Sequence, residues 1–61
     1  MKVYKARKIL SENELWWNDY FDLCRHENQF YGMDTHPMDD ENRREILSAI
    51  ERVKDFLSTG I

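Results

Sequence analysis

The stretch LSENELWWNDYF, residues 10–21, decides the fold that the sequence predicts. Ser11 and Glu14 have the spacing of a capping box, in which the serine side chain accepts from the amide of Glu14 and the glutamate reaches back to the amide of Ser11. Leu10 and Leu15 stand at the two positions of a hydrophobic staple around this box. We therefore expect a helix to begin at about residue 12.

This first helix is expected to extend over residues 12–31. Gly32 is a natural left-handed stop for it. A connection over residues 32–37 follows, and Pro37 disfavours helical backbone at the residue before it. Two glycines and one proline in the whole chain leave few other places for a break.

A second helix is expected over residues 38–58. The helix dipole favours negative charge at the start of a helix. The acidic residues at this start are Asp39, Asp40 and Glu41. Apolar residues recur in it at helical spacing and form a narrow stripe. They are Ile46, Ala49, Ile50, Val53, Phe56 and Leu57. Residues 59–61, with Gly60 before Ile61, are typical of a Schellman ending.

Residues 1–10 form a basic arm in this prediction. Val, Tyr and Ile occur within residues 2–9 without a clean alternation, so this part is expected to be a short strand or extended coil. The predicted fold is all-α, with or without one short N-terminal strand. It is a single small domain, residues 1–61, built as an antiparallel two-helix hairpin after the arm.

The adjacent tryptophans pose a problem for this hairpin. Neighbouring helical residues point about 100° apart, so Trp16 and Trp17 cannot fill one hole in a small core. The apolar arc of the first helix spans about half its circumference, which is wider than one partner helix covers. Either the arm and the second helix bury the surplus, or a tryptophan, Trp17 before Trp16, faces a partner or a second copy.

Glu27 falls inside this apolar arc. A carboxylate among apolar side chains needs a partner. The arm supplies candidates in Lys5, Arg7 and Lys8, so we expect Glu27 to be paired with one of them.

The net charge of −3 is unevenly distributed. Residues 1–10 carry four basic side chains and no acid, whereas residues 12–42 carry nine acids against Arg25 alone. Cys24 is the one cysteine, which excludes an internal disulfide and fits a reducing, cytoplasmic compartment. The first residues have no apolar signal-peptide region, and no run approaches the ~20 apolar residues of a membrane span.

Catalytic and metal chemistry is not favoured. Metal-ligand types cluster only at Cys24, His26, Asp34 and His36, and Cys24 and His26 are two apart on the predicted helix, so they diverge by about 200°. The same divergence disfavours a Cys–His nucleophile. No glycine-rich phosphate loop is present. We expect no catalytic residues, no metal and no cofactor, and hence a protein that is not an enzyme.

The sequence favours a small acidic module that binds another protein with a basic surface. Such a module would be an inhibitor or adaptor that covers a site on a larger protein, in the style of phage anti-defence and host-takeover proteins. Methionine adds adaptable apolar contact beside the acids. The expected partner-binding residues are Trp17, Phe21, Asp34, Met38, Asp39, Asp40 and Glu41.

Two alternatives remain open. An arm that forms a strand, followed by two helices, is similar in outline to ribbon-helix-helix repressors, which dimerise through the strand and place its side chains in the major groove of DNA. This resemblance implies nucleic-acid contacts from Lys2, Lys5, Arg7 and Lys8. A structural homodimer, whose four helices share the aromatic seam, is the second alternative.

Overall fold

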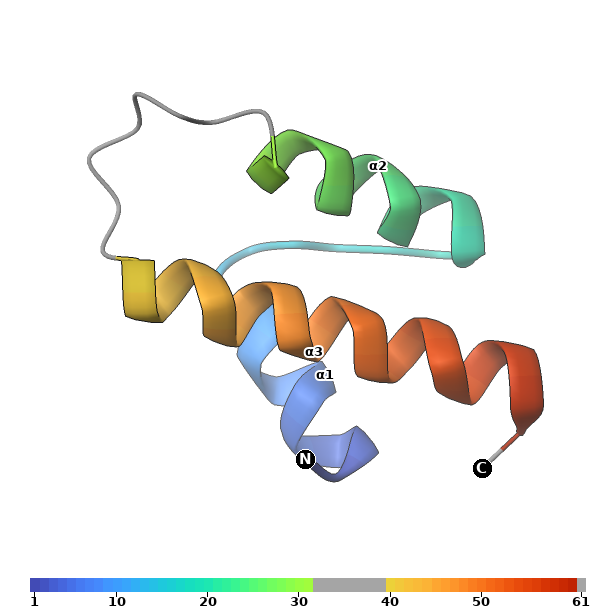
Figure 1. Ribbon diagram of the computed structural model, residues 1–61. Helices are drawn as coiled ribbons and strands as arrows, with labels where there is room; N and C mark the ends of the chain where they lie inside the picture. Colours follow the sequence, from blue (N-terminus) through green and yellow to red (C-terminus); the bar gives the residue numbers. More distant parts are fainter. Residues whose placement is uncertain (32–39, 61) are drawn as a thin grey trace.

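The computed structural model describes residues 1–31 and 40–60, and these form three helices (Figure 1). They are α1 (Val3–Glu12), α2 (Tyr20–Tyr31) and α3 (Asp40–Thr59), and the described residues contain no strand. The all-α prediction is confirmed, but the two-helix hairpin is wrong. The predicted connection over residues 32–37 lies outside the described residues.

The long helix α3 is the element on which the other two pack (Figure 1). α2 runs antiparallel to it, and α1 crosses it on another side. The buried side chains come from all three helices and from the segment between α1 and α2. They are Ala6, Ile9, Leu10, Leu15, Leu23, Phe30, Ile46, Ala49, Ile50 and Val53. This core is aliphatic apart from one phenylalanine.

Residues 3–12 are helical, so the predicted strand or arm is wrong. Ala6, Ile9 and Leu10 are buried, and Val3 is half-buried one turn earlier, which is helical rather than alternating spacing. The two lysines and one arginine among the remaining residues of the segment are strong helix formers. The basic residues of α1 lie on its exposed side because its apolar stripe packs against α3.

The SENE segment ends α1 instead of starting a helix. Glu14 has φ of 58°, the left-handed conformation, and its amide donates to the carbonyl of Ser11 (3.1 Å). The amide of Leu15 donates to the carbonyl of Leu10 (2.9 Å). These two bonds are those of a Schellman motif, whose apolar contact joins the positions of Leu10 and Leu15. The same two leucines that suggest a staple therefore close a helix end.

A short segment, residues 13–19, links α1 to α2, and side-chain hydrogen bonds resembling a capping box lie at its end. The side chain of Asp19 accepts from the amide of Asp22 (3.1 Å) at the start of α2. The side chain of Asp22 reaches back to the amide of Asn18 (3.0 Å). Reciprocal bonds of this kind satisfy amides that have no partner inside the helix.

The end of α3 matches its prediction closely. The predicted helix stops at residue 58 and the observed one at Thr59. Gly60 has φ of 76°, and its amide donates to the carbonyl of Phe56 (2.7 Å), which is the simpler left-handed cap. The predicted contact of Ile61 and the predicted helix start at residue 38 lie outside the described residues.

The left-handed backbone at Glu14 yields a stability test. Glu14→Gly should raise the free energy of unfolding by about 1 kcal/mol, because glycine adopts positive φ without the steric cost of a side chain. Glu12→Gly makes the same change inside α1 and should lower it by about 0.5–1 kcal/mol. Urea unfolding followed by circular dichroism measures both. If Glu14→Gly destabilised the protein as much as Glu12→Gly, the helix end at residue 13 would be wrong.

The cap of α2 can be tested in the same assay. Asp19→Ala should cost about 1 kcal/mol of unfolding free energy, because an amide at the start of α2 loses its acceptor. Asp19→Asn keeps an acceptor oxygen and should stay close to wild type. Equal losses in the two variants would show that the charge of Asp19, rather than its cap, is what matters.

Candidate functional site

The two adjacent tryptophans lie on the extended linker rather than on a helix (Figure 1). Successive side chains of extended backbone point to opposite sides. Leu15 is accordingly buried, Trp16 is 68% exposed, and Trp17 is half-buried against the core. One tryptophan thus helps to close the core while its neighbour faces outward.

Most aromatic side chains of this protein are on its surface. Of the eight, only Phe30 is buried, and six are exposed. The exposed ones are Tyr4, Trp16, Tyr20, Phe21, Tyr31 and Phe56. A core filled by leucine, isoleucine, valine and alanine leaves the large rings outside. Contiguous exposed apolar area marks contact surfaces, whereas rings scattered singly are common on any protein surface.

Two of these rings flank an open groove between α1 and the linker, which we call the aromatic–basic groove. Its lining is Tyr4, Arg7, Lys8 and Ser11 from two turns of α1, with Leu15, Trp16, Trp17 and Asn18 from the linker. The buried Leu15 and half-buried Trp17 give it an apolar base, and Tyr4 (72% exposed) and Trp16 stand at the surface.

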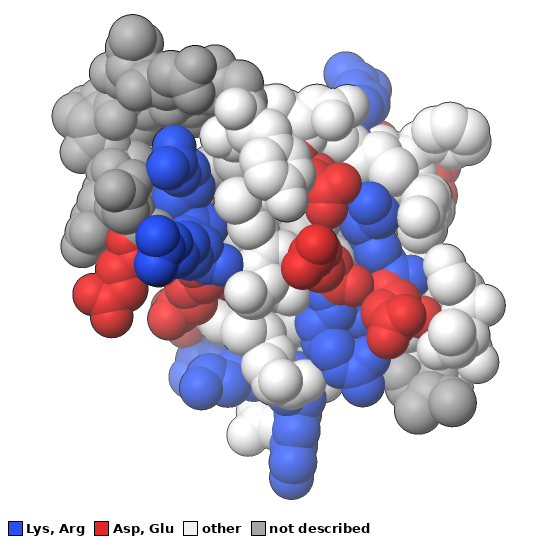
Figure 2. All heavy atoms as spheres, viewed as in Figure 1, with Lys and Arg blue, Asp and Glu red and all other residues white. Residues whose placement is uncertain are grey.

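The charge in this groove is positive. Arg7 and Lys8 are its charged lining residues, and no acidic side chain lines it. Lys8 also lies 3.9 Å from Glu12, in a pair whose members are 72% and 61% exposed. A pair this exposed contributes little and leaves the ammonium accessible. On the face drawn in Figure 2, Lys and Arg side chains lie at several places, including its lower edge, with acidic side chains between them.

Hydrogen bonds hold the linker in place beside α1. The ring Nε2 of His26 on α2 donates to the carbonyl of Trp16 (2.8 Å). The amide of Leu15 is tied to α1 by the helix-end bond described above. Trp16 also borders a small polar hollow lined by Asp22, Arg25, His26 and Gln29. It therefore forms a ridge between this hollow and the aromatic–basic groove.

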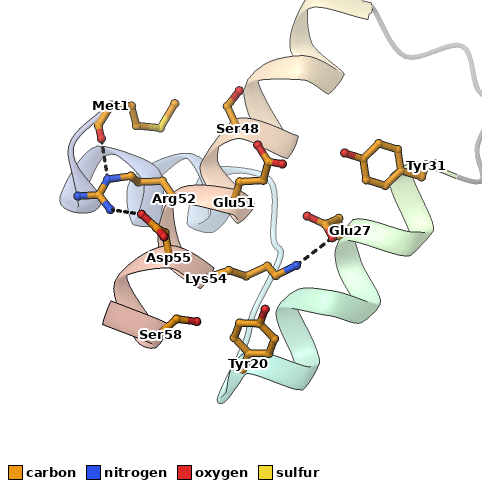
Figure 3. A pocket seen from close by; sticks show the side chains of 10 residues that line it. All are labelled: Met1, Tyr20, Glu27, Tyr31, Ser48, Glu51, Arg52, Lys54, Asp55 and Ser58. Carbon is orange, nitrogen blue, oxygen red and sulfur yellow. Dashed lines mark hydrogen bonds and ion pairs between the residues drawn. The ribbon is translucent and has the colours of Figure 1, made fainter. Parts of the chain in front are cut away.

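A second groove lies between α2 and α3 (Figure 3). Lys54 of α3 donates to Oε1 of Glu27 of α2 at 2.9 Å, and their side chains are only 18% and 17% exposed. The ammonium also lies 5.3 Å from the centre of the Tyr20 ring. The partner of Glu27 is thus Lys54, and the predicted pairing with Lys5, Arg7 or Lys8 is wrong, because α1 packs elsewhere on α3.

This groove is better suited to holding helices together than to catalysis. The hydrogen bond to Glu27 raises the pKa of Lys54 above its ordinary value of 10.5, so the amine stays protonated and is no nucleophile at neutral pH. Arg52 donates to the carbonyl of Met1 (3.0 Å) and lies 3.7 Å from Asp55 (Figure 3). The bond to Met1 links the chain just before α1 to α3.

The predicted partner-binding residues are dispersed. Trp17 lines the aromatic–basic groove, whereas Phe21, 76% exposed on α2, lines neither groove. Glu41 is exposed near the start of α3 and already has an interaction partner. Of the other predicted residues, Asp34, Met38 and Asp39 lie outside the described residues, as does the side chain of Asp40. Their binding role stays a prediction.

The predicted nucleic-acid residues divide into two pairs. Arg7 and Lys8 line the aromatic–basic groove, but Lys2, just before α1, and Lys5, on α1, are exposed without lining it. Sequence reasoning missed Tyr4 and preferred Trp17 to Trp16. The spacing Tyr4, Arg7, Lys8, Ser11 is that of one helical face, so a helical reading of residues 3–12 would have found it.

The described residues hold no group of three or more histidine, cysteine or acidic side chains that could bind a metal ion. None of the three helices is long and apolar enough to cross a membrane. No protein-family model matches the chain, and the searches of curated proteins and of solved structures gave no significant match either.

The raised pKa of Lys54 gives a test at alkaline pH. A raised folded-state pKa stabilises the fold fully below the unfolded value and loses its effect as the pH rises through the folded value. Wild type should exceed Glu27→Gln by about 1 kcal/mol in unfolding free energy at pH 7–9. That difference should shrink above pH 10.5, the ordinary value of a lysine.

Urea unfolding of both proteins at a series of pH values measures this difference. Glu51→Gln is the matched control, because Glu51 lines the same groove but is not the partner of Lys54. If the difference in unfolding free energy between wild type and Glu51→Gln declined in the same way at alkaline pH, general charge repulsion, and not the Glu27–Lys54 pair, would explain the pH dependence.

Proposed function

We propose that this protein is a non-enzymatic module that binds another protein and acts as an inhibitor or adaptor by covering a site on it. The observation that carries this proposal is the exposure of six of the eight aromatic side chains around an aliphatic core. Trp and Tyr are the residues most enriched among those that dominate binding energy at protein interfaces.

The aromatic–basic groove is the part of the surface best suited to this role. Its two exposed rings, Tyr4 and Trp16, stand beside the apolar base formed by Leu15 and Trp17. One wall is a regular helix, and the other is a linker held by hydrogen bonds at both ends. Binding to a surface that is already ordered costs less conformational entropy than binding to a free loop.

The ribbon-helix-helix alternative loses the geometry on which it was based. It needs a strand at the N-terminus, whereas residues 3–12 form α1. On a helix, Lys5 and Arg7 are two positions apart and point about 200° away from each other, so they cannot face DNA together as they would on a strand. A DNA-binding regulator remains an outcome that the experiment below can detect.

The experiment is affinity capture with cross-linking from a lysate of the source organism or its host, with nuclease added. We expect one protein to be enriched by wild type and lost with Trp16→Ala, because a truncated central aromatic typically costs 2 kcal/mol or more of binding energy, about 30-fold in affinity. Phe21→Ala removes an equally exposed ring outside the groove and should retain the partner.

Folding must be checked beside binding. Trp16→Ala should unfold close to wild type, whereas Trp17→Ala should lose about 2–3 kcal/mol, because Trp17 packs against the core. A captured partner that survives Trp16→Ala but not Phe21→Ala would move the site to α2. Capture of the protein's own copies alone, with a dimer mass in solution, would favour the structural homodimer.

A further inference from the structure

We propose that the aromatic–basic groove binds an acidic peptide segment that carries a large apolar side chain. This inference rests on the proposed protein-binding function and adds the chemistry of the partner. It differs from the sequence-based expectation of a basic partner surface, which depended on acids at residues 34–41. The groove offers cations and rings instead.

The first argument is charge. Arg7 and Lys8 face the groove without an acidic lining residue, and within the described part of the chain Arg7 has no ion pair while Lys8 has only the long, exposed contact to Glu12. An arginine guanidinium is always charged and binds a carboxylate through two parallel hydrogen bonds. A carboxylate seated here would therefore gain a strong partner without displacing an existing one.

The second argument is the apolar base. Leu15, which is buried, and Trp17, which is half-buried, line the groove together with the exposed rings of Tyr4 and Trp16. An aliphatic or aromatic side chain placed there would bury area on several sides, which carboxylates alone cannot do. The α1 wall, from Tyr4 to Ser11, is about 10 Å long at 1.5 Å per residue. It matches two turns of a bound helix or a few extended residues.

The small number of cations in the groove favours a peptide over a nucleic acid. Single-stranded nucleic acid also binds to exposed rings beside cations, through base stacking and phosphate contacts. However, the groove holds two cations, whereas backbone binding to nucleic acid depends on many phosphate contacts. The net charge of −3 on the chain adds long-range repulsion that a long polyanion feels more than a short peptide does. The acidic peptide is therefore the occupant that the observations favour.

The test uses a displayed random peptide library selected on the whole wild-type protein. Enriched peptides should combine aspartate or glutamate with a large apolar residue, and synthetic copies of them should bind with a steep salt dependence. Their affinity for Arg7→Glu/Lys8→Glu should fall by about tenfold or more, since like charges would then face each other. Replacing the peptide acids by lysine should restore binding to this variant.

The matched control is Lys2→Glu/Lys5→Glu, which makes the same change in net charge at the N-terminal end of α1, outside the groove. Its affinity for the peptides should change by about twofold at most. Circular dichroism shows whether both double variants keep the fold. Equal losses in the two variants would overturn the proposal, because they would show a general field rather than contact in the groove.

Other outcomes separate this inference from the proposed function. Peptides that need Trp16 but show no acidic bias would leave protein binding intact and overturn the acidic partner. If no selected peptide depended on Trp16, both would fall. Competition by an oligothymidine would assign the groove to nucleic acid, and a dimer mass that disappears in Arg7→Glu/Lys8→Glu would assign it to a second copy.

Discussion

The reversal of the chain at Asn13, Glu14 and Leu15 is the constraint on which the rest of this structure depends. It ends α1 after only ten residues, and it keeps Leu10 and Leu15 together in the core. The chain then leaves α1 as an extended linker, and this allows α2 to start beside the far end of α3 (Figure 1). A continuous helix through this point would carry the tryptophans and α2 away from the core.

The second half of the described fold could be read from the sequence. The stripe from Ile46 to Val53 and the cap at Gly60 use local signals that nothing nearby contradicts. The first twenty residues could not be read in this way, because Leu10, Ser11, Glu14 and Leu15 fit two motifs equally well. A serine and a glutamate three apart start helices, and two leucines five apart close them.

Burial against α3 decides between these motifs. If the helix began at residue 12, the apolar positions of residues 3–10 would have no helical stripe to place on the core. Once residues 3–12 are helical, Ala6, Ile9 and Leu10 are all buried. The cost is one non-glycine residue, Glu14, in left-handed backbone. Tertiary packing therefore decides which motif forms, and the residues around the turn do not specify it on their own.

Of the predicted partner-binding residues that the structure describes, only Trp17 lines the aromatic–basic groove. The surplus of aromatic residues left two outcomes open, and the structure shows the one in which most rings stay exposed. The helical wheel chose Trp17 because it assumed about 100° between neighbours, while the extended linker alternates and leaves Trp16 outside. Tyr4 was overlooked because residues 2–9 were read as a strand or coil, which does not bring it onto one face with Arg7 and Ser11.

The three helices contribute unequally to the core of the described residues. α1 and α3 share seven of the ten core residues, whereas α2 contributes only Leu23 and Phe30. The free energy of local opening is therefore expected to be lower for α2 than for α1 and α3. Its opening would release His26 from the carbonyl of Trp16. A ligand that fixes Trp16 would consequently protect α2 from opening. Binding in the groove beside α1 would then order a helix that packs on another side of α3.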